Sequence, residues 1–189
     1  DCALRIRDAI RRDLLEPLQL DRAGRLLAKY IDHADMSPGR VRILGQCTTS
    51  WLVPALTAVA WGAAFPLEVV DGEYDNIVQE LMSRPDLASE TTVLLPWNRS
   101  LLKSREQSID AAISAAMDTW KFIWNLVAER GGSRLIQVGY DCATSGSLGG
   151  HLGSESGDVA MIRTMNTVLR AELPPNAIFV DLAEASGQM

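Results

Sequence analysis

Short apolar runs that alternate with helix-forming segments are the feature that most limits how this sequence can fold. Beyond residue 40, the apolar runs lie at residues 41–44, 67–70, 91–95, 135–138 and 177–180. Each run is separated from the next by a segment with helical periodicity, which is the pattern of right-handed crossovers between parallel strands. Strands that are apolar throughout are typical of sheets covered on both faces. The sequence therefore predicts an α/β protein, a three-layer α/β/α sandwich with a five-stranded parallel sheet.

Two amphipathic segments precede the first of these runs. Residues 3–15 read as one helix, which we expect Pro17 to stop. Asp21 is the expected N-cap of a second helix, and a loop around Ser37-Pro38-Gly39 follows it. Short helices are marginal on their own. We therefore expect residues 1–39 to form a helical segment packed on a main α/β domain of residues 40–189.

Capping residues predict where the helices of the main domain begin. The expected helices cover residues 50–62, 74–82, 104–130 and a segment from residue 158 onward. Thr49 is the expected N-cap of the first, and Asp158 that of the last. Ser104-Arg105-Glu106-Gln107 has the form of a capping box and is expected to open the longest helix.

The composition excludes several classes of function. The net charge is -6 and the pI is about 4.9, which is opposite to the basic surface of nucleic-acid-binding proteins. No apolar run reaches the roughly 18 residues of a membrane helix, and no signal peptide opens the chain. We expect a cytoplasmic protein without a nucleic-acid or membrane partner. Because the chain begins with Asp1, we interpret it as part of a longer protein.

Cysteine and histidine are too few and too scattered for a metal site. The three cysteines, Cys2, Cys47 and Cys142, form an odd set without close spacing, which favours a reducing compartment and no disulfide framework. The two histidines add no ligand spacing. We expect neither a metal nor a cofactor in this domain.

Candidate site residues follow the ends of the first three predicted strands. In a parallel sheet these ends meet at one edge, where open α/β sheets bind ligands. Gly45, Cys47 and Thr48 follow the first strand, Gly72 the second and Asn98 the third. We expect Cys47 to lie just before a helix, where the helix dipole favours a thiolate, so it is the candidate nucleophile.

Each of these residues also has a purely structural interpretation. Cys47 is equally a small side chain packed under a turn. Thr48 can bind a ligand phosphate or, with Thr49 and Ser50, cap the helix. Asn98 can point into a pocket or close a turn. His151, in a glycine-rich loop, is a candidate base for Cys47 or simply an exposed loop residue.

The same residues resemble the SGNH hydrolases. That family has a nucleophile in a Gly-Asp-Ser turn after strand one, a glycine after strand two and an asparagine after strand three. Gly45-Gln46-Cys47, Gly72 and Pro96-Trp97-Asn98-Arg99 occupy the matching places. The resemblance implies an oxyanion hole formed by the Cys47 and Gly72 amides and the Asn98 side chain. Cysteine replaces the serine, and the Asp-x-x-His pair of the family has no counterpart before Met189.

A longer stretch resembles the amino-terminal domain of FkbH-like proteins, of subfamily IIIC of the haloacid dehalogenase (HAD) superfamily. The matching segments are 44–49, 73–76, 148–150, 165–169 and 180–182. In that family an SGNH-like domain precedes a HAD-type phosphatase domain. The whole protein transfers a glyceryl unit from a bisphosphoglycerate to an acyl carrier protein in polyketide biosynthesis. The resemblance implies that this chain is the accessory or carrier-binding domain, with the carrier protein and a C-terminal phosphatase-like domain as partners.

Two alternatives stay open at this point. One is a stand-alone SGNH-type esterase or acyltransferase that uses Cys47 as nucleophile and Asn98 in the oxyanion hole. The other is a mononucleotide-binding domain of flavodoxin type, which shares the predicted sheet. The glycine-rich loop of residues 146–157 lacks the lysine of a phosphate-binding loop, which weakens the second alternative.

Overall fold

A computed structural model describes residues 2–33, 38–84, 86–102, 108–132, 134–141, 157–182 and 184. In these residues, five strands form one parallel sheet in the order β2-β1-β3-β4-β5. The strands are β1 (Gly39–Gly45), β2 (Leu67–Asp71), β3 (Glu90–Leu95), β4 (Arg134–Val138) and β5 (Ala177–Val180). The helices are α1 (Cys2–Arg11), α2 (Pro17–His33), α3 (Leu52–Gly62), α4 (Ile77–Ser83), α5 (Asn98–Leu102), α6 (Ile109–Glu129) and α7 (Asp158–Glu172).

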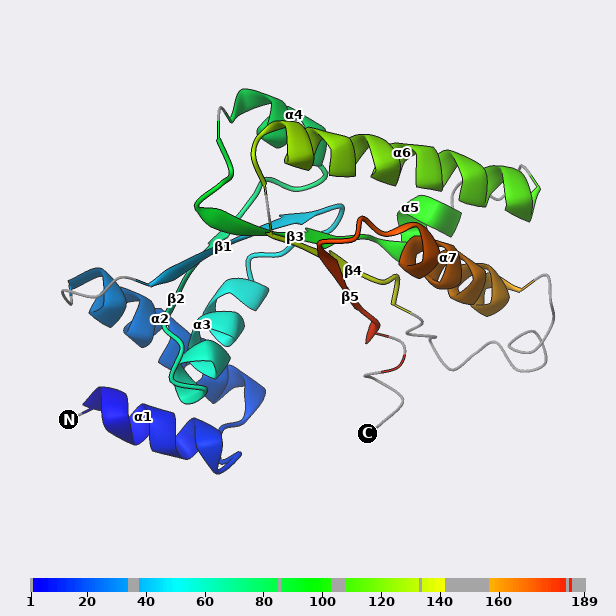
Figure 1. Cartoon of the computed structure of the whole chain (residues 1–189). Coiled ribbons are helices and arrows are strands. Elements are labelled where there is room, and N and C mark those ends of the chain that lie inside the picture. Colours follow the sequence, from blue (N-terminus) through cyan, green and yellow to red (C-terminus); the bar gives the residue numbers. More distant parts are fainter. Residues whose placement is uncertain are drawn as a thin grey trace.

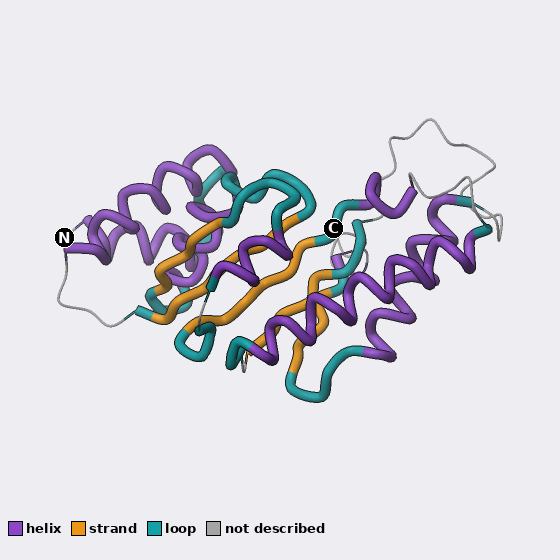
Figure 2. The backbone as a smooth tube through the Cα atoms, turned by 90° about the horizontal axis from the view of Figure 1, so that it is seen from above, coloured by secondary structure: helices purple, strands orange, loops and turns teal. Residues whose placement is uncertain are grey.

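Helices cover both faces of the sheet, so the predicted three-layer α/β/α sandwich is confirmed (Figure 1). Helices α4, α6 and α7 lie over one face, because the chain moves across the sheet in one direction from β2 to β5. Helix α3 lies on the other face, with α1 and α2 packed outside it. Figure 2 shows the strands side by side and the N-terminal helices gathered toward the β2 end of the sheet.

The strand order places a switch point at the ends of β1 and β3. The chain leaves β1 toward β2 on one side and returns to β3 on the other. Cα register pairs Ile43 with Val93 and Gly45 with Leu95, so the two strands end next to each other. In open α/β sheets, ligands bind in the crevice at such a point.

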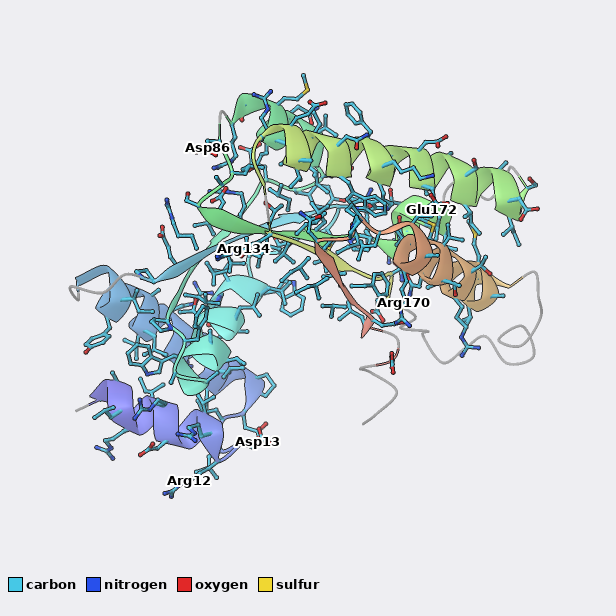
Figure 3. The ribbon with its side chains drawn as sticks, viewed as in Figure 1. Arg12, Asp13, Asp86, Arg134, Arg170 and Glu172 are labelled. Carbon is cyan, nitrogen blue, oxygen red and sulfur yellow. The ribbon has the colours of Figure 1, made fainter. Side chains whose placement is uncertain are left out.

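The beginning of the chain differs from the prediction at Pro17. Helix α1 ends earlier than predicted, at Arg11. The backbone of Asp13 has a φ of 53°. Arg12 and Asp13 lie at the outer side of the helical layer (Figure 3). Pro17 does not stop α1 but is the first residue of α2. Proline fits this position because the first helical amides need no partner within the helix. Asp21 therefore lies inside α2, where it pairs with Arg25 at 2.9 Å.

The helices of the main domain do not begin at their predicted N-caps. Helix α3 starts after Trp51, and Thr49 is buried and makes no side-chain capping bond. Helix α6 starts after Ser108, whose hydroxyl accepts a hydrogen bond from the Ala111 amide. The predicted capping box, residues 104–107, lies outside the described residues. Asp158 is the first residue of α7 and not its cap.

Helix α5, over Asn98–Leu102, was not predicted at all. It follows Pro96 and Trp97 directly, and its Leu101 belongs to the apolar cluster under α6. None of the helices in the described ranges is long and apolar enough to cross a membrane.

Candidate functional site

The bends after β1, β2 and β3 meet at the carboxyl edge of the sheet. The Gln46 amide donates to the Leu95 carbonyl oxygen (3.0 Å), which ties the end of β1 to that of β3. The Asp75 amide donates to the Gly45 carbonyl oxygen (3.1 Å), which brings in the turn after β2. The Trp97 amide donates to Oε1 of Gln46 (3.1 Å). The structure therefore brings the predicted residues Gly45, Cys47, Thr48, Gly72 and Asn98 to one edge.

Gly45 is needed for the bend that carries Cys47. A Cβ at Gly45 would lie 2.5 Å from Cγ2 of Thr49 and 3.0 Å from the carbonyl oxygen of Cys47, because the chain folds back over the end of β1. The next residue, Thr48, is exposed at the edge, and its carbonyl oxygen accepts a hydrogen bond from Nε1 of Trp51 (2.9 Å).

Cys47 does not have the environment of an activated thiolate. Its thiol is half-buried, and burial raises the pKa of that thiol, against a smaller opposing effect of a backbone hydrogen bond. The predicted support from a helix dipole is missing, because α3 begins only at Leu52. Among the described residues, no side chain forms a hydrogen bond with the thiol. Cys142 and His151, the candidate base, lie outside the described residues.

Gly72 is at the edge, but its amide is already used. The amide donates to the Ile43 carbonyl oxygen (2.8 Å) and so extends the pairing of β1 with β2. In this arrangement the amide is not free to donate to a ligand, so it gives no support to the oxyanion-hole role that the SGNH resemblance implied. The residue is small for a packing reason, since a Cβ would lie 2.6 Å from Cδ2 of Leu44 and 2.5 Å from Oε1 of Glu80.

Asn98 links the ends of β3 and β4 as the first residue of α5. Its Nδ2 donates to the carbonyl oxygen of Asp141 at 3.4 Å, and the side chain stays half-buried at the edge. This bond fits the interpretation of Asn98 as a turn-closing residue better than that of an oxyanion-hole donor. The second N–H of the side-chain amide is a further donor.

Sequence reasoning missed three residues beside Asn98, which we call the edge aromatic cluster: Tyr74, Trp97 and Arg99. Tyr74 and Trp97 pack edge to face with ring centroids 6.2 Å apart, and the Arg99 guanidinium lies 5.6 Å from the Trp97 ring centroid. Tyr74 remains mostly exposed. The sequence signal for Tyr74 and Trp97 was their position, since each follows closely after the end of a strand. The cluster offers aromatic surface next to polar groups.

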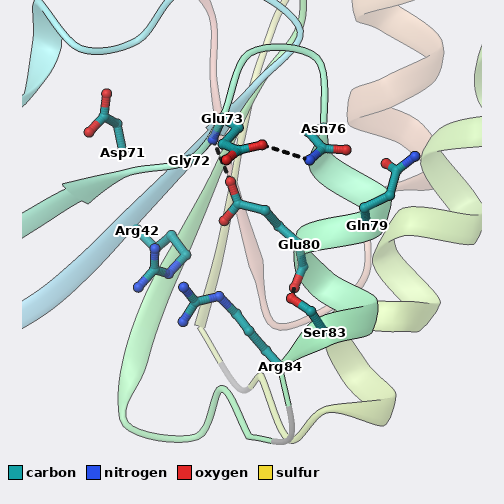
Figure 4. A pocket seen from close by; sticks show the side chains of 9 residues that line it. All are labelled: Arg42, Asp71, Gly72, Glu73, Asn76, Gln79, Glu80, Ser83 and Arg84. Atoms are coloured by element: carbon teal, nitrogen blue, oxygen red, sulfur yellow. Dashed lines mark hydrogen bonds between the residues drawn. The ribbon is translucent and has the colours of Figure 1, made fainter.

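A second candidate region lies behind Gly72, in a pocket of about 640 Å³ beside α4 (Figure 4). Its lining residues are Arg42, Asp71, Gly72, Glu73, Asn76, Gln79, Glu80, Ser83 and Arg84. Nε of Arg42 donates to Oε1 of Glu90 (3.1 Å), and Nη1 of Arg84 lies 3.6 Å from the same oxygen. One signal was visible in the sequence, because Arg42 interrupts an otherwise apolar strand.

No metal centre is evident in the described part of the chain, where no three histidine, cysteine, aspartate or glutamate side chains gather to hold an ion. No family model matches the chain, and no curated protein matches it.

The fold is similar to that of a solved chain, the N-terminal part of the protein BF1531 from Bacteroides fragilis, which contains a phosphatase domain and is complexed with Mg. The TM-score is 0.60 and the identity 19%, over 87% of this chain and 46% of the solved one. The chain thus spans about half the length of the solved chain that it matches. At this identity, the similarity shows a shared α/β fold.

Proposed function

We propose that this chain is the SGNH-like domain of an FkbH-like protein, which takes part in glyceryl transfer from a bisphosphoglycerate to an acyl carrier protein. Its own role is to bind the carrier protein, or the arm that bears the glyceryl unit, at the carboxyl edge of the sheet. The observation that carries the proposal is the meeting of the bends after β1, β2 and β3 at this edge. The similar solved chain contains a phosphatase domain, which agrees with an FkbH-like protein that combines this fold with such a domain.

Binding fits the edge better than nucleophilic catalysis. Burial raises the pKa of the Cys47 thiol, and the Gly72 amide already donates to Ile43, so neither favours the role that the SGNH resemblance implies. Thr48 and Asn98 offer hydrogen bonds, and Trp97 and Tyr74 offer aromatic surface. A carrier-protein arm, which alternates amide groups with short alkyl segments, matches such a surface.

The test is a titration of an isotope-labelled acyl carrier protein with this chain, followed by NMR. We expect the carrier with its arm attached to bind more tightly than the carrier without it. Trp97→Ala is expected to weaken binding about tenfold, because it removes the largest side chain of the edge aromatic cluster. Met82→Ala is the matched control, since Met82 is an exposed apolar residue of α4 away from this edge.

Equal binding by the Trp97→Ala and Met82→Ala variants would contradict the proposal, as would no binding of either form of the carrier. The alternative of a stand-alone esterase has its own readout. Hydrolysis of a p-nitrophenyl ester that is lost on Cys47→Ala would support the esterase and replace the carrier-binding role.

A further inference from the structure

The pocket beside α4 contains two arginines that share one carboxylate. The side chains of Arg42 and Glu90 are only 8% and 9% exposed, and that of Arg84 is 32% exposed. Both guanidinium groups approach the same oxygen, Oε1 of Glu90. The pocket lining also includes Asp71, Glu73 and Glu80, but Glu90 is the one carboxylate within ion-pair distance of either guanidinium among the described residues. Because buried charges are normally paired, a further anion between Arg42 and Arg84 would be favourable.

Hydrogen-bond donors are also in excess around Arg42. A guanidinium has five N–H donors, but in the described part of the chain the only hydrogen bond of the Arg42 side chain is that from Nε to Glu90. Its neighbour in the β1–β3 register, Thr92, is fully buried, and Oγ1 of Thr92 has no partner among the described residues. Arg42 lines the pocket, so its remaining donors are available to a ligand.

Two of the three acidic residues that line the pocket, Glu73 and Glu80, form a hydrogen-bonded group with Asn76, and Asp71 is drawn apart from this group in Figure 4. Oε1 of Glu80 accepts a hydrogen bond from the Glu73 amide, and Oε2 of Glu73 accepts one from Nδ2 of Asn76 (3.1 Å). Figure 4 shows this bonded group near Gly72, whereas Arg42 and Arg84 point toward each other on the side away from Asn76. The pocket therefore has a cationic end and an end rich in hydrogen-bond acceptors, which suits an anion that also carries hydroxyl groups.

We propose that this pocket binds a small hydroxylated oxyanion, with its phosphate or carboxylate group held between Arg42 and Arg84. Guanidinium groups are the preferred partners of both anions. The volume of about 640 Å³ is within the range of small-molecule sites. The site differs from the carrier-binding edge and does not depend on the proposed function.

The experiment follows the melting temperature of the whole chain as inorganic phosphate or acetate is added, with sodium chloride at equal ionic strength as the reference. A ligand that binds only the folded state raises the melting temperature in a saturable way. Saturation by phosphate or by acetate supports the site and identifies which anion it prefers. A response to neither anion beyond that to sodium chloride overturns the proposal.

Two arginine variants, one inside the pocket and one on the exposed surface, separate a ligand site from a structural ion cluster. Arg84→Gln is expected to weaken the apparent affinity for the anion about tenfold or more, because it removes a charged hydrogen-bond partner. Arg134→Gln removes the same charge from the exposed start of β4 and should leave the affinity unchanged. If Arg84→Gln lowers the melting temperature without changing the response to the anion, the arginines are structural and the proposal is wrong.

A third variant gives an effect of opposite sign. Glu90→Gln removes the anion that competes for both arginines, so added phosphate or acetate should bind more tightly and restore stability. Tighter anion binding by Glu90→Gln would show that the two arginines can hold an added anion. A cluster in which Glu90 is the required partner of the arginines would not give this result. Weaker anion binding by Glu90→Gln than by the parent chain would overturn the proposal even where Arg84→Gln gives the expected loss.

Discussion

The two faces of the sheet differ in how completely they are covered. Under α4, α6 and α7, a continuous apolar cluster reaches from Leu44, Leu94 and Leu135 on the strands to Trp120 and Met165 on the helices. On the opposite face, α3 packs against β2 and the smaller apolar cluster lies between α1, α2 and α3. There, on β5, Ile178 and Val180 are 61% and 38% exposed.

This difference separates the part of the molecule that stabilises the fold from the parts that are free to bind. Two pairs of polar side chains inside the covered face are hydrogen-bonded: Nε1 of Trp120 donates to the Tyr140 hydroxyl (2.9 Å), and Nε1 of Trp124 donates to Oε1 of Gln137 (2.9 Å). Burial raises the pKa of Tyr140 to about 12, so this hydroxyl stays neutral. Both candidate binding regions lie outside this core, one at the carboxyl edge and one beside the edge strand β2.

Removing one large side chain from each face tests the comparison most severely. Trp120→Ala is expected to lower the free energy of unfolding by about 3–5 kcal/mol, because Trp120 is fully buried in the larger cluster. Trp61→Ala, in the smaller cluster of α1, α2 and α3, should cost less, since this cluster is small and can collapse around the gap. Urea unfolding followed by circular dichroism measures both, with the exposed Phe122→Ala as control. An equal or larger loss for Trp61→Ala would show that the two faces contribute alike.

A smaller effect is expected from Asn166, which holds the chain just after β4. Its Oδ1 accepts a hydrogen bond from the Tyr140 amide (2.7 Å), and its Nδ2 donates to the Tyr140 carbonyl oxygen (3.0 Å). Asn166→Ala leaves both buried groups without partners and should cost about 1–3 kcal/mol in the free energy of unfolding. Thr164→Ala, on an exposed turn of the same helix, is the control. A cost no larger than that of the control would mean that water or neighbouring groups replace the two bonds.

The architecture was predictable from the sequence because it depends on periodicity. The five strands and their parallel arrangement follow from apolar runs separated by helical segments, and the observed strands extend the predicted ones by no more than two residues at either end. Helix starts were less predictable, because several residues of one segment can serve as caps. Ser108 and Ser104 both have the required hydroxyl, and the sequence pattern favours Ser104, whereas the structure shows Ser108 as the N-cap of α6.

The candidate site was predictable in position but not in chemistry. Parallel strands bring their ends together whatever their side chains are, so Cys47, Gly72 and Asn98 reach one edge. The direction of the Gly72 amide and the burial of the Cys47 thiol depend on contacts with Ile43 and on where α3 begins. The pocket beside α4 was not predictable, because its arginines are distant in the sequence and meet only through Glu90.

Alkylation of the two described cysteines is expected to show the smallest effect. The alkylation rate of each cysteine reports how accessible a different region is. Cys2 is exposed on α1, in the outer helical layer, whereas Cys47 is half-buried at the edge of the sheet. At neutral pH we expect a thiol-alkylating probe to label Cys47 more slowly than Cys2, because burial both limits access and raises the pKa of the Cys47 thiol. The rate at Cys47 should rise with pH, with a midpoint above the ordinary value of a cysteine thiol. The same shift means that the Cys47 contribution to stability is present below the pKa of the unfolded thiol and is lost as the pH rises through the folded pKa. Mass spectrometry of the Cys142→Ser variant over a pH series measures both rates. A midpoint below the ordinary value would show that the edge stabilises a thiolate, and Cys47 would then return as the nucleophile of this domain.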